Sequence, residues 1–155
     1  MKNFAKLVYN LDATTSLNEK TRHLRDYFAN EASANAVWAL YLLMEKSRKR
    51  TVTSRMLAQT FLNTRQMPEW LFRECYSHVG DTTETISLLL KGESHNEPNP
   101  LELHEWLESE IPKIKALESD EEKQALIESW WRGLEENQIF VLNKILTGAF
   151  RIGAS

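Results

Sequence analysis

Apolar residues in this chain recur every three or four positions rather than every two, and this spacing restricts the fold more than any other feature. Such a repeat places an apolar stripe along an α-helix, whereas alternation would indicate strands. Glycine and proline, which interrupt helices, number only five and four in 155 residues. The sequence therefore predicts an all-α fold, a compact multi-helix domain of about eight to nine helices.

A chain of this length is expected to form one domain, residues 1–155, with a substantial buried core. The longest clear loop covers residues 91–99, and we expect it to be the place where two helical subdomains meet. Turn residues and capping patterns predict where the helices begin. The expected helices begin near residues 3, 16, 34, 53, 68, 81, 99, 119 and 135.

Three features of the side-chain pattern predict what is buried. The expected helix at residues 34–46 is apolar on almost every side, which predicts a central position in the bundle. The five tryptophans fall among leucines at helical spacing, so we expect them in the core rather than as platforms for stacked bases. The single cysteine, Cys75, excludes an internal disulfide and favours a reducing compartment. Its helical context predicts a small buried side chain.

Charge is divided unevenly along the chain, although the net charge is only −3. Residues 1–80 hold 12 Lys and Arg against 7 Asp and Glu, and residues 81–155 hold 7 against 15, which gives balances of +5 and −8. The net charge argues against nonspecific binding to polyanions, but local potential still permits a basic face. The basic run between residues 46 and 55 has two interpretations, a solvated helix end or a contact with DNA, and the sequence leaves both open. It consists of Lys46, Arg48, Lys49, Arg50 and Arg55.

The sequence lacks the usual signatures of catalysis. It contains no Gly-x-x-x-x-Gly-Lys-Ser/Thr loop, no Gly-x-Ser-x-Gly elbow, and no histidine pair four residues apart with a carboxylate partner. We therefore expect no catalytic, metal or cofactor site in these residues. The sequence also lacks a membrane-spanning apolar run and an N-terminal signal segment, so we expect no membrane partner and a cytoplasmic location.

Two segments combine residue types that suit phosphate. The expected helix start at Ser16 forms a capping box with Glu19, and a capped helix start presents backbone N–H groups and hydroxyls to an anion, with Lys20 one turn further on. The final segment, 148–155, places Arg151 between Gly148 and Gly153. Glycine permits close backbone approach, and the arginine fork suits phosphate. The alternative for each segment is structural: an N-cap, and a helix C-cap followed by the terminus.

Three segments together resemble one protein family. They are residues 11–20 (LDATTSLNEK), 70–86 (WLFRECYSHVGDTTETI) and 142–155 (LNKILTGAFRIGAS). In this order and spacing they are similar to the N-terminal, all-helical DNA-binding domain of ATP-dependent DNA ligases, particularly a bacterial branch. The resemblance covers essentially the whole chain.

The resemblance implies a function for the domain and a set of contact residues. The domain is expected to act as a monomer that grips nicked double-stranded DNA across the minor groove, in support of nick sealing during DNA repair, replication and recombination. The bacterial branch implies a cytoplasmic, nucleoid-associated activity. The Gly80-Asp81 turn matches a family turn that we interpret mainly as structural, with a phosphate approach as the alternative. The residues implied to contact DNA are Thr15, Ser16, Asn18, Lys20, Gly80, Gly148, Arg151, Gly153, Ala154 and Ser155.

The resemblance also implies that the chemistry lies elsewhere. Family members carry nucleotidyltransferase and OB-fold domains after this one, use ATP and Mg²⁺, and form an adenylate on the lysine of a Lys-x-Asp-Gly motif. That motif does not occur in these 155 residues, so we expect the chain alone to be inactive. It is either a piece of a longer enzyme or a stand-alone relative, and its abrupt end favours a piece. The alternative function is a helical protein-interaction module without nucleic-acid binding, which the acidic second half supports.

Overall fold

The structure is a computed structural model that describes residues 1–44, 50–93, 98–148 and 150. Within these ranges the regular structure consists of nine α-helices, one π-helical turn and one 3-10 helix, with no strand, so the predicted all-α class is confirmed. None of the described helices is long and apolar enough to cross a membrane. The elements are α1 (Lys2–Asp12), α2 (Leu17–Asn30), α3 (Ser33–Met44), α4 (Ser54–Arg65), α5 (Glu69–Val79), α6 (Thr82–Leu90), α7 (Leu103–Glu105), η1 (Trp106–Glu110), η2 (Ile111–Ala116), α8 (Asp120–Arg132) and α9 (Glu136–Thr147).

Side-chain N-caps fix the starts of α2, α4, α6 and α8. Each cap oxygen accepts a hydrogen bond from a backbone N–H of the first turn, which satisfies a donor that has no partner inside the helix. The starts at Ser16, Asp81 and Ser119 follow capping patterns in the sequence. All four observed starts lie within one residue of the expected positions. The cap residues are Ser16 for α2, Thr53 for α4, Asp81 for α6 and Ser119 for α8.

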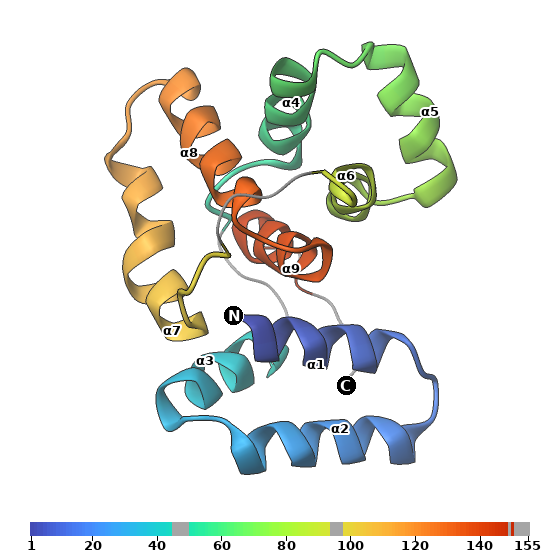
Figure 1. Ribbon diagram of the computed structural model, residues 1–155, viewed down its shortest axis with the longest axis vertical. Coiled ribbons are helices and arrows are strands. Elements are labelled where there is room, and N and C mark those ends of the chain that lie inside the picture. Colours follow the sequence, from blue (N-terminus) through green and yellow to red (C-terminus); the bar gives the residue numbers. More distant parts are fainter. Residues whose placement is uncertain (45–49, 94–97, 149, 151–155) are drawn as a thin grey trace.

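The central helix of the molecule is α9. It packs against α6 and α1, while α4 packs against both α6 and α8 (Figure 1). Five apolar side chains of α9 are at most 1% exposed, and they form the middle of the buried cluster: Ile139, Val141, Leu142, Ile145 and Leu146. α9 therefore forms the buried centre against which α1 and α6 pack.

The prediction that the third helix is central is wrong. α3 buries only Asn35, Ala39 and Leu42 among its twelve residues, and it lies at the edge of the bundle (Figure 1). Its opposite side is exposed and apolar: Val37, Leu40, Tyr41 and Met44. An all-round apolar sequence is compatible with a buried position but does not impose one, because exposed apolar side chains are common on folded proteins.

The helix expected to begin at Asn99 and Pro100 instead begins at Leu103. Asn99 is held in a turn, since its N–H donates to the carbonyl of Gly133 at 2.9 Å and its side chain accepts from the N–H of Leu101 at 2.8 Å. The helical path then changes from α to π and to 3-10 between residues 103 and 116. Pro112 lies at the start of the 3-10 segment, where its missing N–H prevents a regular α-helix from continuing.

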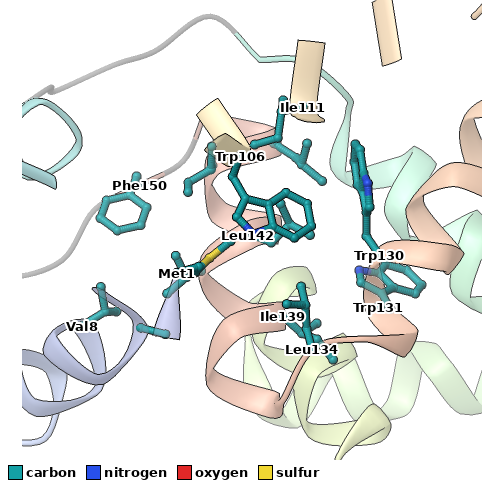
Figure 2. Close-up of a cluster of buried hydrophobic side chains, with 14 of the residues drawn as sticks. Met1, Val8, Trp106, Ile111, Trp130, Trp131, Leu134, Ile139, Leu142 and Phe150 are labelled. Carbon is teal, nitrogen blue, oxygen red and sulfur yellow. The ribbon is translucent and has the colours of Figure 1, made fainter. Parts of the chain in front are cut away.

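Three of the five tryptophans are in the core, as predicted. Trp106 and Trp130, drawn in Figure 2, meet edge to face with ring centroids 5.6 Å apart. The indole N–H of Trp131 donates to Asn143 at 3.0 Å. Trp70 contradicts the prediction, because it lies on the outer side of α5 and is 66% exposed. Cys75, on the same helix, is only half-buried, so the expected burial is wrong there as well.

Helices from both sides of the 91–99 loop share one core. α4 packs on α8, α6 packs on α9, and α3 packs on α7. A single cluster of buried apolar residues contains members from the first and second halves of the chain. The loop therefore joins elements that stabilise one another directly.

Candidate nucleic-acid interface

The start of α2 is a capped and exposed helix end. The hydroxyl of Ser16 accepts from the N–H of Glu19 at 3.3 Å, as the capping pattern predicts. The Glu19 carboxylate accepts from the Thr14 hydroxyl at 2.6 Å, and the Ser16 N–H donates to the same Thr14 oxygen at 3.1 Å. In a full capping box the Glu19 side chain would accept from the N–H of Ser16, and here Thr14 accepts that hydrogen bond instead. Thr15 and Asn18 are exposed beside this end.

Gly148 ends α9 in the left-handed conformation. Its φ is +69°, and its N–H donates to the carbonyl of Ile145 at 3.2 Å, so the expected C-cap is confirmed. Two positions later, the buried ring of Phe150 stacks on Phe4 of α1 with centroids 5.6 Å apart, near Val8 (Figure 2). This contact places the chain against α1. The remaining predicted contacts of this segment, Arg151, Gly153, Ala154 and Ser155, lie outside the described residues.

Gly80 and Asp81 form the turn from α5 to α6. Gly80 has a φ of +85° and caps α5, while open space surrounds the position of a Cβ atom, so conformation rather than crowding requires glycine here. One oxygen of Asp81 accepts from the N–H and the hydroxyl of Thr83 at 2.9 and 2.8 Å. The other oxygen accepts a hydrogen bond from the ammonium group of Lys144.

The last turn of α9 connects two helix starts. Lys144 binds Asp81 at the start of α6. The carbonyl of Leu146 accepts from the N–H groups of Thr51 and Val52, at 2.8 and 3.1 Å, just before the start of α4. We call this meeting point the α9 junction: residues 50–55, 80–81 and 144–148. The positive ends of the α4 and α6 dipoles lie here, which favours a negatively charged ligand.

Two exposed basic groups belong to the α9 junction. Arg50 and Arg55 are both exposed, one before and one inside the first turn of α4. This first turn contains no acidic residue, whereas α6 has Glu84 in its first turn and Asp81 as its cap. Lys46, Arg48 and Lys49, the rest of the basic run, lie outside the described residues. Arg50 and Arg55, the described residues of the basic run, thus lie at the α9 junction rather than at the end of α3.

The structure brings together only part of the predicted site. Gly80 and Gly148 both belong to the α9 junction, although 68 positions separate them in the sequence. The Ser16 end of α2 is separated from α9 by α1, which packs against both helices (Figure 1). Sequence reasoning missed the pairing of Asp81 with Lys144, because no local pattern indicates a contact across 63 positions.

The Asp81 carboxyl is held in its charged form. Partial burial by itself raises the pKa of this group, but the hydrogen bonds and charge of Lys144, with the two hydrogen bonds from Thr83, act in the opposite direction. The net result is a pKa below the ordinary value for aspartate. The junction therefore contains one fixed anion with its own cation.

One group of described residues has the composition of a metal site. The side chains of Glu102, His104 and Glu105 have possible ligand atoms within 4.8 Å of one another. These groups serve the start of α7: Glu105 accepts from the N–H of Glu102 at 3.0 Å, and His104 Nδ1 lies 2.7 Å from Asn35 Oδ1. We interpret the group as a helix cap rather than as a metal centre.

The fold and the α9 junction define a class of protein: an all-helical domain whose candidate site is a surface of helix ends and exposed arginines rather than an enclosed pocket. The chain belongs to the family described as DNA ligase N terminus, whose model matches residues 1–155. This match confirms the family that the three sequence segments indicate. No curated protein matches the chain.

Proposed function

We propose that this chain is the DNA-binding domain of an ATP-dependent DNA ligase and that it grips nicked duplex DNA. Family membership supports the ligase assignment. The observation that carries the DNA-binding role is the α9 junction, where two glycine turns, two helix N-termini and the exposed Arg50 and Arg55 meet. Such a surface suits phosphate groups along a backbone better than the edges of bases.

The role is positional. Contacts with phosphates and sugars across the minor groove fix the register of the domain without reading sequence. By holding both sides of a nick, the domain aligns the 3′-hydroxyl and the 5′-phosphate, which is a proximity effect that serves an active site elsewhere in the enzyme. The chain acts as a monomer in the bacterial nucleoid, during DNA repair, replication and recombination.

The proposed contacts divide by chemistry. Lys20 and Arg151 provide charge for phosphates, and Ser16 and Asn18 add side-chain hydrogen bonds at the α2 end. The glycine turns permit close approach of the backbone. The exposed Arg50 and Arg55 add charge at the α9 junction. The contacts that the family resemblance implies are Thr15, Ser16, Asn18, Lys20, Gly80, Gly148, Arg151, Gly153, Ala154 and Ser155.

The catalytic steps belong to the parent enzyme. ATP and Mg²⁺ supply the adenylyl group and its charge stabilisation for transfer to lysine, then to the 5′-phosphate, before the phosphodiester bond closes with release of AMP. This chain contains no Lys-x-Asp-Gly motif, so it contributes binding and alignment.

A titration of labelled nicked duplex tests the proposal. We expect binding that weakens steeply with salt, with a slope of log K against log [salt] of roughly −3 to −5 for about three to five neutralised phosphates. Affinity should be the same for unrelated base sequences. Binding that ignores salt, or that depends on sequence, would contradict the proposal.

Arg151→Ala separates a phosphate contact from a general loss of structure. The variant should bind all sequences more weakly and should flatten the salt slope by about one unit, because one phosphate contact is lost. Lys113→Ala is the matched control and should leave the slope unchanged. Lys113 is an exposed cation of η2 that pairs with Glu110, the last residue of η1. An unchanged slope in Arg151→Ala would remove this residue from the contact set.

One observation favours the second candidate function, a helical protein-interaction module without nucleic-acid binding. The exposed apolar side of α3 forms a continuous stripe at helical spacing: Val37, Leu40, Tyr41 and Met44. Contiguous exposed apolar surface often marks a protein contact. If nicked duplex produces no shift at low salt, this function is the one that remains.

A further inference from the structure

We propose that Lys144 and Asp81 are positioning residues of the DNA-binding surface, holding the Gly80 turn and the Gly148 turn at a fixed separation. The inference rests on the proposed function, because it concerns how the α9 junction is kept ready for phosphates. It assigns Lys144 a role distinct from phosphate contact, although Lys144 is the basic residue nearest to Gly148 in the described sequence.

Lys144 is poorly placed to meet a phosphate. Its side chain is only 12% exposed, and its ammonium group donates to Asp81 and lies 5.5 Å from the centre of the Phe140 ring. Because this ammonium is largely buried and already paired with Asp81, it offers a phosphate little accessible charge. The charge of Lys144 is therefore used inside the protein.

Asp81 is fixed on the α6 side by several bonds. One carboxylate oxygen binds the N–H and hydroxyl of Thr83, and the backbone carbonyl accepts from the N–H and hydroxyl of Thr85 at 2.9 and 2.7 Å. Thr83 and Thr85 are themselves buried. Gly80 precedes Asp81 directly, so the position of the Gly80 turn follows that of Asp81.

Lys144 connects the fixed position of Asp81 to the C-terminal end of α9. It lies in the last turn, four residues before Gly148, and one helical turn is a rigid spacer. The second oxygen of Asp81 binds Lys144, so the two glycine turns are connected through one ion pair and one turn of helix. The carbonyl of Leu146, in the same turn, also holds the segment before α4. Loss of the pair would let the start of α6 move relative to the other two helix ends.

Lys144→Met tests the proposal, because methionine keeps the length and apolar packing of the side chain and removes the ammonium group. Nicked duplex binding should weaken by roughly fivefold to tenfold, as expected when a surface is no longer preorganised. The salt slope should stay at the wild-type value, because no phosphate contact is lost. Both quantities are measured by fluorescence anisotropy with labelled nicked duplex, well below the melting temperature of each protein.

Arg65→Met is the matched control. Arg65 lies in the last turn of α4, at the opposite end from the α9 junction. Its side chain is 15% exposed and pairs with Glu93 and Glu128. Its replacement also removes a largely buried ion pair, so stability should fall, while DNA affinity should stay within about twofold of wild type. Equal losses of affinity in both variants would overturn the proposal in favour of a general stability effect.

Asp81→Asn provides a second route if Lys144→Met does not fold. Asparagine still caps α6 and removes the charge that holds Lys144. We expect the same weakening, and the double variant should bind no more weakly than either single variant, because both changes break one connection. Wild-type affinity in either single variant would overturn the proposal, as would a salt slope one unit flatter in Lys144→Met. Failure of the wild-type protein to bind nicked duplex would overturn the proposed function itself.

Discussion

Individual polar side chains connect the helix ends of this domain, and the Asp81 carboxylate does so at the α9 junction. It combines an N-cap for α6 with an ion pair to Lys144. Partial burial by itself raises the pKa of this carboxyl, and the bonds from Lys144 and Thr83 together bring the pKa below its ordinary value. The charged form is therefore part of the folded structure, and folding stability becomes linked to pH.

Asp81 should contribute to acid sensitivity. Its pKa is lower in the folded state than in the unfolded state, so the unfolded state binds the proton first as pH falls. The contribution to stability is present above the ordinary carboxyl pKa of about 4 and is lost as pH falls through the lower folded value. Glu110, bound by Trp130 and Lys113, has a lowered pKa and adds a contribution of the same sign.

Urea unfolding of wild type and Asp81→Asn between pH 6 and pH 2 measures this linkage. Wild type should lose stability over this range. Asp81→Asn should begin less stable at pH 6, because Lys144 has lost its anion, and should decline less steeply, because one linked group is gone. Parallel curves for the two proteins would show that Asp81 titrates alike in the folded and unfolded states.

At the scale of elements, helix starts were the most predictable feature. The capping patterns at Ser16, Asp81 and Ser119 mark real boundaries, since the donors they satisfy lie within three residues along the chain. Residues 99–116 could not be predicted in the same way. There Asn99 is held by Gly133, on a distant helix end, and a tertiary contact of this kind leaves no local pattern. The position of α3 was predicted wrongly for another reason, because its apolar sequence is compatible with a central position and also with an edge position.

Substitutions on the two sides of α3 should therefore differ sharply. Val37→Gln and Met44→Gln should change stability by no more than about 0.5 kcal/mol, because both side chains are mostly exposed. Leu42→Ala should cost about 2–5 kcal/mol, because Leu42 is 1% exposed and leaves a cavity. Thermal or urea unfolding of the three variants measures the difference. Large losses in both glutamine variants would mean that α3 is buried after all.

At the scale of the whole molecule, the sequence predicts the composition of the candidate site better than its assembly. The glycine turns are visible because Gly80 and Gly148 follow apolar helical runs. Their meeting at one junction depends on α9 packing against α6, and the arrangement of packed helices is set by the core rather than by any single segment. The separation of the Ser16 end from that junction by α1 follows from the same packing.

The same packing predicts that the domain unfolds as one unit. The core cluster draws on both halves of the chain, and α9 contacts α1 and α6 as well as carrying Asn143, which accepts from the Trp131 indole. Unfolding either half would expose apolar residues of the other, so partly folded states are disfavoured. Urea unfolding should show coincident transitions by tryptophan fluorescence and by far-ultraviolet circular dichroism. The three buried tryptophans all lie in the second half of the chain, whereas circular dichroism reports the helices of both halves. Transitions with different midpoints would show instead that the helices on the two sides of the 91–99 loop fold independently.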